Sequence, residues 1–267
     1  MKPLSRDAKL GIGIFALLLI VTIFAATQQQ SEERHPRLST LSSAPDGALA
    51  LKLWMDALDY PVHDQTLANF APPEEASILF MLEPLFPTEG EMKAIDEWVQ
   101  EDGGTLILIG DRYGAFSAVD HYDFAFDYQP QDQNVPKIEA PILLSPPEFN
   151  PGDANTRIVL ESERDDFVVL MTNQGHPVLV SFDLGEGRVI LGTISDIFTN
   201  AGLKRPGNPE LALNVLALAK NKGPVWFDEW HHGVQSGGQI LGPSEFLRRT
   251  PIGRALLFIV FAVLVVF

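Results

Sequence analysis

Two uninterrupted apolar runs give the first picture of this chain. Residues 76–82 and 104–110 are apolar almost throughout, which is typical of strands buried on both faces. Between them, Thr88 and Glu91 have the spacing of a capping box, and apolar residues follow at helical spacing. The pattern therefore predicts a strand–helix–strand unit.

Similar patterns extend through most of the chain. Helices are expected near residues 45–59, 88–101 and 208–220, and strands over 157–163, 167–172, 177–182, 189–192 and 224–228. Residues 111–147, rich in Asp, Gln, Pro and aromatic residues, are expected to form an irregular excursion over the surface. We predict a flavodoxin-like α/β fold with a mainly parallel sheet and flanking helices, in which strands 76–82, 104–110 and 224–228 are neighbours.

Both ends of the chain carry apolar runs of another kind. Residues 10–27 contain no charge and follow basic residues, so we predict a transmembrane helix; a cleaved signal peptide is the alternative. Residues 252–267 are predicted to be the start of a second transmembrane helix. The expected organisation is a basic tail (1–9), the first helix (10–27), a linker (28–38), an α/β domain (39–235), a second linker (236–251) and the second helix (252–267).

The basic residues near the ends bear on orientation. Lys2, Arg6 and Lys9 precede the first apolar run, which predicts a cytoplasmic N-terminus and a domain outside the cytoplasm. Three arginines at positions 248, 249 and 254 argue for the reverse orientation. We keep the first orientation because long domains weaken charge counting.

Charge and cysteine content exclude several functions. The formal net charge is −16, and because the first nine residues carry +2 and the three late arginines +3, the remainder carries −21. Nucleic-acid binding requires basic patches, so this acidic chain is not expected to bind nucleic acid. The acidic surface is either a solvated face or a docking surface for a basic partner. The absence of cysteine excludes disulfides, thiolate metal sites and a cysteine nucleophile.

The main candidate site directly follows the strand at 224–228. Asp228, Glu229, His231 and His232 are side chains that can bind metal or transfer protons. In an extended strand Glu229 and His231 share one face and could meet one ion or pair with each other. We weigh three hypotheses: structural or partner-docking roles, a divalent metal at Glu229, His231 and His232, and general acid–base catalysis. The spacing differs from the helical His-Glu-x-x-His of zinc proteases.

Secondary candidates follow other strands. Asp111 comes directly after the strand at 104–110, where α/β folds commonly place ligand groups, although it could simply cap the next turn. Asp196 and Asn200 follow the strand at 189–192 and are expected to face the same crevice. No phosphate-binding loop or dinucleotide fingerprint is found, so no organic cofactor is expected.

Several short motifs, in this order, resemble the bacterial DUF4350 proteins. They are Ser43-Ala44-Pro45-Asp46-Gly47, Glu101-Asp102-Gly103-Gly104-Thr105-Leu106-Ile107, Gly185-Glu186-Gly187-Arg188-Val189, Thr199-Asn200 and Phe227-Asp228-Glu229-Trp230-His231-His232-Gly233. The resemblance implies a relative of class I glutamine amidotransferase-like folds in the bacterial cytoplasmic membrane, encoded near MoxR-type AAA ATPases and DUF58-like proteins as candidate partners. The amidotransferase chemistry does not carry over, because its nucleophile is a cysteine.

Two functions remain open from the sequence. The first is a non-enzymatic, membrane-anchored binding or scaffold protein, favoured because no nucleophile constellation is recognisable. The alternative is a metal-dependent hydrolase that uses Glu229, His231 and His232, with Asp111 or Asp196 in support.

Overall fold

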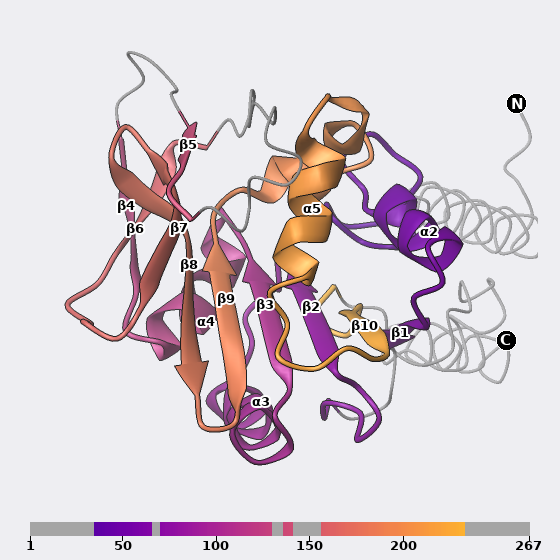
Figure 1. The fold of residues 1–267 in the computed structure, drawn as a ribbon, viewed down its shortest axis with the longest axis horizontal. Coiled ribbons are helices and arrows are strands. Elements are labelled where there is room, and N and C mark those ends of the chain that lie inside the picture. The colour runs from indigo at the N-terminus through magenta and orange to yellow at the C-terminus, as the bar shows by residue number, and fades with distance from the viewer. Residues whose placement is uncertain (1–34, 66–69, 130–135, 141–155, 233–267) are drawn as a thin grey trace, which may run out of the picture. The chain divides into compact units, whose positions relative to one another are not determined.

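The computed structural model of this chain describes residues 35–65, 70–129, 136–140 and 156–232. The chain divides into two units, residues 35–237 in one and residues 1–34 and 238–267 in the other. All described residues belong to the first unit, which is shown in Figure 1.

An eight-stranded sheet in the order β1-β10-β2-β3-β9-β8-β7-β5 is the framework of this unit (Figure 1). Its strands are β1 (Val62–Gln65), β2 (Ile78–Leu82), β3 (Thr105–Ile109), β5 (Pro136–Ile138), β7 (Val168–Asn173), β8 (His176–Leu184), β9 (Gly187–Gly192) and β10 (Val225–Asp228). The pairs from β1 to β9 are parallel, and those from β9 to β5 are antiparallel. The predicted neighbours β10, β2 and β3 are confirmed, with parallel pairing.

Within the described ranges, four α-helices and three short 3-10 helices accompany the sheet. They are α2 (Leu49–Ala57), α3 (Glu89–Asp102), α4 (Phe116–His121), α5 (Asn208–Leu216), η1 (Tyr113–Ala115), η3 (Ser195–Phe198) and η4 (Gly202–Lys204). The predicted capping box of α3 is confirmed: the Thr88 hydroxyl accepts from the main-chain N–H of Glu91, whose carboxylate accepts from Thr88 N–H. Gly103 ends this helix in the left-handed conformation at φ 69°.

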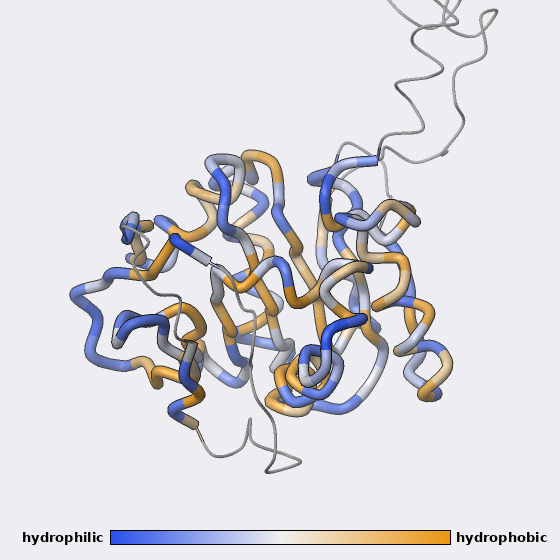
Figure 2. The backbone as a smooth tube through the Cα atoms, turned by 90° about the horizontal axis from the view of Figure 1, so that it is seen from above, coloured by the Kyte–Doolittle hydropathy of each residue, from blue (hydrophilic) through white to orange (hydrophobic). Residues whose placement is uncertain are grey.

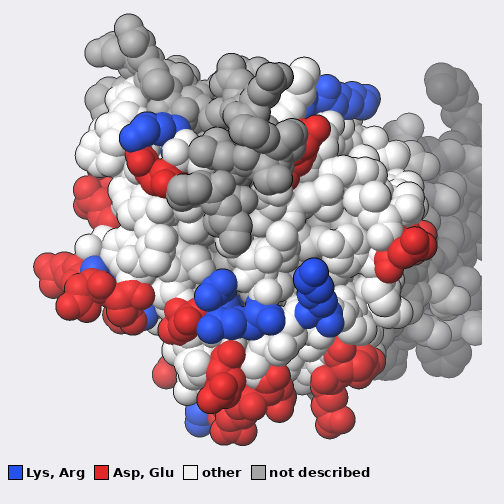
Figure 3. All heavy atoms as spheres, viewed as in Figure 1, with Lys and Arg blue, Asp and Glu red and all other residues white. Residues whose placement is uncertain are grey.

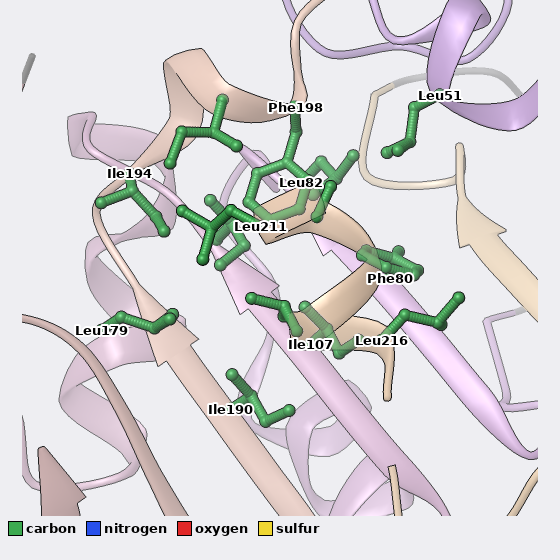
Figure 4. Packing of buried hydrophobic residues seen from close by; sticks show 14 of the residues in the cluster. Leu51, Phe80, Leu82, Ile107, Leu179, Ile190, Ile194, Phe198, Leu211 and Leu216 are labelled. Carbon is green, nitrogen blue, oxygen red and sulfur yellow. The ribbon is translucent and has the colours of Figure 1, made fainter. Parts of the chain in front are cut away.

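The helices cover the sheet on both faces because its central strands are largely apolar on both faces, and β2 is apolar at every position. Along β2, Phe80 and Leu82 belong to the core shared with α5 and α2, whereas Leu79 and Met81 belong to the core shared with α3 and α4. Figure 4 shows the first core, where Leu211 of α5 lies over the strands. Figure 2 shows hydrophobic stretches along the central strands and hydrophilic ones along many surrounding loops. Burial on both faces explains the continuous apolar runs.

The fold-class prediction requires two corrections. The sheet is mixed rather than mainly parallel, because the tight turn between β8 and β9 makes these strands antiparallel and β7 and β5 continue that pattern. The predicted transmembrane helices are also corrected: within the described ranges, no helix is long and apolar enough to cross a bilayer. The segments for which they were predicted, 10–27 and 252–267, lie outside the described residues.

The prediction of an irregular excursion at residues 111–147 was wrong over most of the described part. This stretch contains η1, α4 and β5 as well as β4 (Ala125–Tyr128), which pairs antiparallel with β6 (Ile158–Glu161) in a separate two-stranded ribbon. Aromatic residues that looked like loop composition are packed into the core: Tyr122 and Phe124, in the connection between α4 and β4, are buried.

The close approach of β9 to α3 gives a test of the packing. A Cβ at Gly187 would collide with the main-chain oxygens of Gly104 and Val99. Because the backbone cannot shift cheaply, Gly187→Ala is expected to lower the unfolding free energy by about 2 kcal/mol or more in urea denaturation. Gly90→Ala is the control, since a Cβ at Gly90 meets no atom within 4 Å; it should be neutral or stabilise by up to about 1 kcal/mol. Equal stabilities of the two variants would contradict the packing.

Candidate functional site

The segment after β10 folds back on itself at the carboxyl end of the strand. β10 ends at Asp228, and a turn over residues 230–232 follows. Asp228, Glu229, His231 and His232 are all buried, with 1–6% of their surface exposed. A buried carboxylate or imidazolium needs compensating partners, so the partners decide what this segment can do.

Glu229 is held by the beginning of the domain. Its carboxylate accepts from the Ser39 hydroxyl at 2.7 Å, the Thr40 main-chain N–H at 2.6 Å and the Thr40 hydroxyl at 2.7 Å. The Thr40 hydroxyl also lies 2.8 Å from Asp64 of β1, which pairs with Lys52 of α2. Burial opposes ionisation of Glu229, but the hydrogen bonds and the nearby His232 outweigh it and lower the pKa of Glu229. The segment that begins the described domain and the segment that follows its last strand are therefore connected through the carboxylate of Glu229.

His232 has an acceptor at each ring nitrogen. Its Nδ1 lies 3.2 Å from Glu229 Oε2, and its Nε2 lies 2.6 Å from the main-chain oxygen of Leu82. A carbonyl and a carboxylate only accept, so both nitrogens donate and the ring is a cation. Burial lowers the pKa of His232, but its bond to Glu229 and that carboxylate's charge raise it more, and the net direction is upward. The hydrogen bond of His232 to Leu82 thus connects the segment after β10 to the end of β2.

Asp228 and His231 form the second pair. The Asp228 carboxylate accepts from His231 Nδ1 at 2.6 Å and from the His231 main-chain N–H at 3.2 Å. His231 Nε2 lies 3.4 Å from Glu91 Oε2, close enough for ionic attraction but without hydrogen-bond geometry. Burial opposes the charge, but Asp228 and then Glu91 raise the pKa of His231. Trp230 adds a 3.0 Å bond from its indole N–H to Glu91.

The pairing differs from the one expected for an extended strand. Each carboxylate pairs with the histidine three residues later, because the strand ends at Asp228 and the chain then turns. The expectation that Asp228 and Glu229 each pair with a histidine or backbone donor is confirmed. For the metal hypothesis at Glu229, His231 and His232, the described part of the chain contains no group of three or more such side chains that could hold an ion.

A second cluster of charges lies where three parallel strands end. The guanidinium nitrogens of Arg37 lie 2.6 Å from a carboxylate oxygen of Glu83, 3.1 Å from one of Asp111 and 2.6 Å from one of Asp196. Glu83 follows β2, Asp111 follows β3 and Asp196 follows β9. Ser195 donates its hydroxyl to Glu83 Oε1 at 2.8 Å. We call Arg37, Glu83, Asp111, Ser195 and Asp196 the arginine–carboxylate cluster. It holds three carboxylates for one guanidinium, and its exposure increases from 6% at the Glu83 side chain to 42% at Asp196.

The excess of carboxylates changes the titration of this cluster. Burial and the neighbouring Glu83 raise the pKa of Asp111 to about 7, although Arg37 opposes the shift. Glu83 also has a backbone φ of 51°, in the left-handed region that residues other than glycine rarely adopt. Strained residues cluster at functional sites, so the end of β2 is a second candidate position.

The secondary candidates separate in the structure. Asp111 and Asp196 share Arg37, as their positions after neighbouring strands suggested. Asn200 instead holds the loop before α2: its amide donates to Ser42 and Ala44 oxygens and its oxygen accepts from Ala50 N–H. Asn200 therefore stabilises a loop outside the cluster.

Sequence reasoning missed Arg37, Glu83, Ser39 and Thr40. Glu83 could have been found from the sequence, because it directly follows a buried strand. Asp111 has a similar position, one residue further from the end of its strand. Arg37 and the two hydroxyl residues carried none, since they lie in the segment before α2 and reach the sheet only through the tertiary fold.

Neutralising the buried carboxylate of Glu229 tests how much its contacts with Ser39, Thr40 and His232 stabilise the fold; we call these contacts the Glu229 junction. Glu229→Gln replaces an acceptor oxygen by an N–H donor facing other donors, so it is expected to lower the unfolding free energy by about 3–5 kcal/mol. Glu97→Gln, at a side chain that is 62% exposed, should stay within about 0.5 kcal/mol of wild type. Denaturant titrations of both variants measure this. A Glu229→Gln protein as stable as the control would show that the junction is dispensable.

The raised pKa of His232 predicts a pH dependence with a definite sign. A pKa raised above the unfolded value of 6.5 gives stability that is present below pH 6.5 and lost as the pH rises through the folded value. Unfolding free energy measured from pH 6 upward should therefore fall more steeply in wild type than in His232→Gln. Parallel curves for the two proteins would rule out a charged His232.

Comparisons with known proteins place the chain in a family without indicating an activity. No curated protein matches it. Similar solved structures include cytoplasmic protein STM3548 from Salmonella typhimurium (14% identity over 55% of this chain and 74% of that one, TM-score 0.40) and cytoplasmic protein STM1381 from Salmonella typhimurium LT2 (13%, 58% and 78%, TM-score 0.40). Another is the exo-β-1,4-mannosidase Op5Man5 from Opitutaceae bacterium strain TAV5 (18%, 57% and 27%, TM-score 0.38). TM-scores this low carry no argument.

One family model covers more than half of the chain. It is described as a domain of unknown function, DUF4350, and it matches residues 40–216 of the 267. The match begins at Thr40, which holds Glu229, and runs to the end of α5. The chain therefore belongs to the DUF4350 family.

Proposed function

We propose that this chain is a non-enzymatic binding or scaffold protein that receives a basic side chain of a partner at the arginine–carboxylate cluster. The observation that carries the proposal is the charge imbalance: three carboxylates contact the guanidinium of Arg37, Arg112 adds a 3.9 Å contact to Asp111 alone, and Asp196 remains 42% exposed. An added ammonium or guanidinium group would complete the neutralisation. The cluster also lies at the carboxyl end of parallel strands, where open α/β sheets form their binding crevices.

The Asp228–His232 segment supports a structural role instead. Glu229 has three donors besides His232, both nitrogens of His232 have acceptors, and all four titratable side chains are buried. A group that is buried and internally paired offers little to a ligand. No observation in the described residues favours the hydrolase alternative.

The resemblance to class I glutamine amidotransferase-like folds is part of this proposal as a matter of fold only. It is supported by parallel strands flanked by helices on both faces, while the sequence lacks the cysteine that amidotransferases use. MoxR-type AAA ATPases and DUF58-like proteins are the first partners to test, on the grounds of the family resemblance.

Titration with small cations tests the cluster directly. The full-length protein, labelled with 15N, is titrated with N-acetyl-arginine amide, with N-acetyl-citrulline amide as the neutral control of the same shape. The arginine ligand should shift the amide signals of Asp111 and Asp196 saturably, and Asp196→Asn should weaken its binding. Because a bound cation favours ionised Asp111, whose pKa is about 7, affinity should fall about tenfold from pH 8 to pH 6. Equal shifts with citrulline, or no saturable shift, would refute the proposal.

A further inference from the structure

A row of exposed apolar side chains lies on the loops next to the arginine–carboxylate cluster. Leu85 and Phe86, in the loop after β2, are 48% and 60% exposed. Tyr113 and Phe116, after β3, are 79% and 43% exposed. The ring centroids of Phe86 and Tyr113 are 5.7 Å apart, and those of Tyr113 and Phe116 are 6.4 Å apart. We call these four residues the aromatic row.

The three rings of the aromatic row form a continuous series of contacts, and Leu85 directly precedes the first of them. Phe116 also contacts Phe126 of β4, at 6.3 Å between centroids, and Phe126 packs on the core beneath α3 and α4. Tyr128, the other large exposed aromatic residue among the described positions, has no ring contact with the row. Isolated exposed apolar residues need no explanation, but contiguous ones mark interaction sites.

The two loops that carry the row are fixed to each other. Phe86 N–H donates to the Gly114 oxygen at 2.9 Å, and the Ser117 hydroxyl donates to the Pro87 oxygen at 3.2 Å. A Cβ at Gly114 would lie 2.8 Å from Leu85 Cδ2 and 3.1 Å from the Pro84 oxygen, so the two segments approach each other closely here. Rings held on fixed loops lose little conformational entropy on binding, which favours them as anchors.

The aromatic row includes a residue with a strained backbone conformation. Phe86 has a φ of 53°, in the left-handed region, and the nearby Glu83 has a φ of 51°. Such a conformation costs an aromatic residue about 1–3 kcal/mol and persists where the surroundings enforce it. Here it holds a 60% exposed ring away from the core, next to Tyr113.

We infer that the aromatic row is the docking surface for a segment of a partner protein that carries an apolar or aromatic side chain together with a lysine or arginine. The inference deepens the proposed function and rests on it for the basic residue. Asp111 of the cluster lies two residues before Tyr113, and Glu83 lies three residues before Phe86. One short segment could therefore place its apolar side chain on the rings and its cation at the carboxylates. Arg112, the cation beside the row, lies 3.9 Å from Asp111 Oδ1 and is partly neutralised there.

Charge selects this occupant over a second copy of the chain. The formal net charge is −16, and Figure 3 shows acidic side chains gathered along the edges of one face. Two molecules of this net charge repel each other, whereas a basic segment is attracted.

The test selects peptides from a random library displayed on phage, with the full-length protein as the target. Enriched peptides should combine an aromatic or large aliphatic residue with a lysine or arginine. The binding of one synthetic enriched peptide is then measured by fluorescence anisotropy. Tyr113→Ala should weaken binding at least tenfold, as expected for an interface anchor, and Phe116→Ala should weaken it in the same direction. Tyr128→Ala is the matched control, since it removes a ring that is 57% exposed outside the row, and should leave affinity unchanged.

The outcomes separate the row from the cluster. If Tyr113→Ala weakens binding but Asp196→Asn does not, the row stands and the proposed cation site fails. If only Asp196→Asn matters, the cation site stands and the row is refuted. Failure to enrich any peptide, or equal losses in Tyr113→Ala and Tyr128→Ala, would also refute the row. A dimer seen by light scattering that Tyr113→Ala dissociates would assign the surface to a second copy instead.

Discussion

The buried carboxylate of Glu229 connects the beginning and the end of the folded domain. Burying such a charge is unfavourable unless donors surround it, and here Ser39 and Thr40 supply three hydrogen bonds from a segment about 190 positions away. The same contact fixes β10 at its carboxyl end, and β10 lies between β1 and β2 in the sheet. His232 extends the connection to the oxygen of Leu82 at the end of β2. A change at this carboxylate therefore acts on three strands together.

The two charged sites differ in how completely their charges are matched. At the end of β10, carboxylates and imidazolium rings pair within one buried segment. At the ends of β2, β3 and β9, one guanidinium faces three carboxylates, and the outermost of them is open to solvent. The segment with the densest titratable residues thus lies at the site whose charges are paired with one another. The site with an excess of negative charge is assembled from residues that are far apart in the sequence. Density of titratable residues in a sequence is a poor guide to where a ligand can bind, because neighbours in sequence also neutralise each other.

What could be predicted from the sequence follows from which forces are local. The strands β2, β3 and β10 are recognisable because burial on both faces requires apolar residues at every position, and the start of α3 is recognisable because the capping box satisfies its own N–H groups. The antiparallel pairing of β8 with β9 follows from a tight local turn, but the order in which β9, β8, β7 and β5 extend the parallel strands depends on tertiary packing, which no local pattern states. The pairing of Asp228 with His231 was missed because the chain turns over residues 230–232, whereas the face-sharing argument assumed that it stays extended beyond Asp228. Arg37 reaches three strand ends at once, and only the tertiary fold brings them within its reach.

The strained residues after β2 link the arginine–carboxylate cluster to the aromatic row. Glu83 and Phe86 both have φ near 50°, and they turn the chain so that a carboxylate points to Arg37 while a ring, three residues later, points to solvent. The main-chain bonds from Leu85 to His231 and from Phe86 to Gly114 hold that turn against the end of β10 on one side and against η1 on the other. The saturated junction at Glu229 and His232 therefore has a consequence for binding: it fixes the support on which the unsaturated cluster and the exposed rings are built. Rigidity at the buried site reduces the ordering cost at the open one, which is how an internally paired segment can matter for function without touching a ligand.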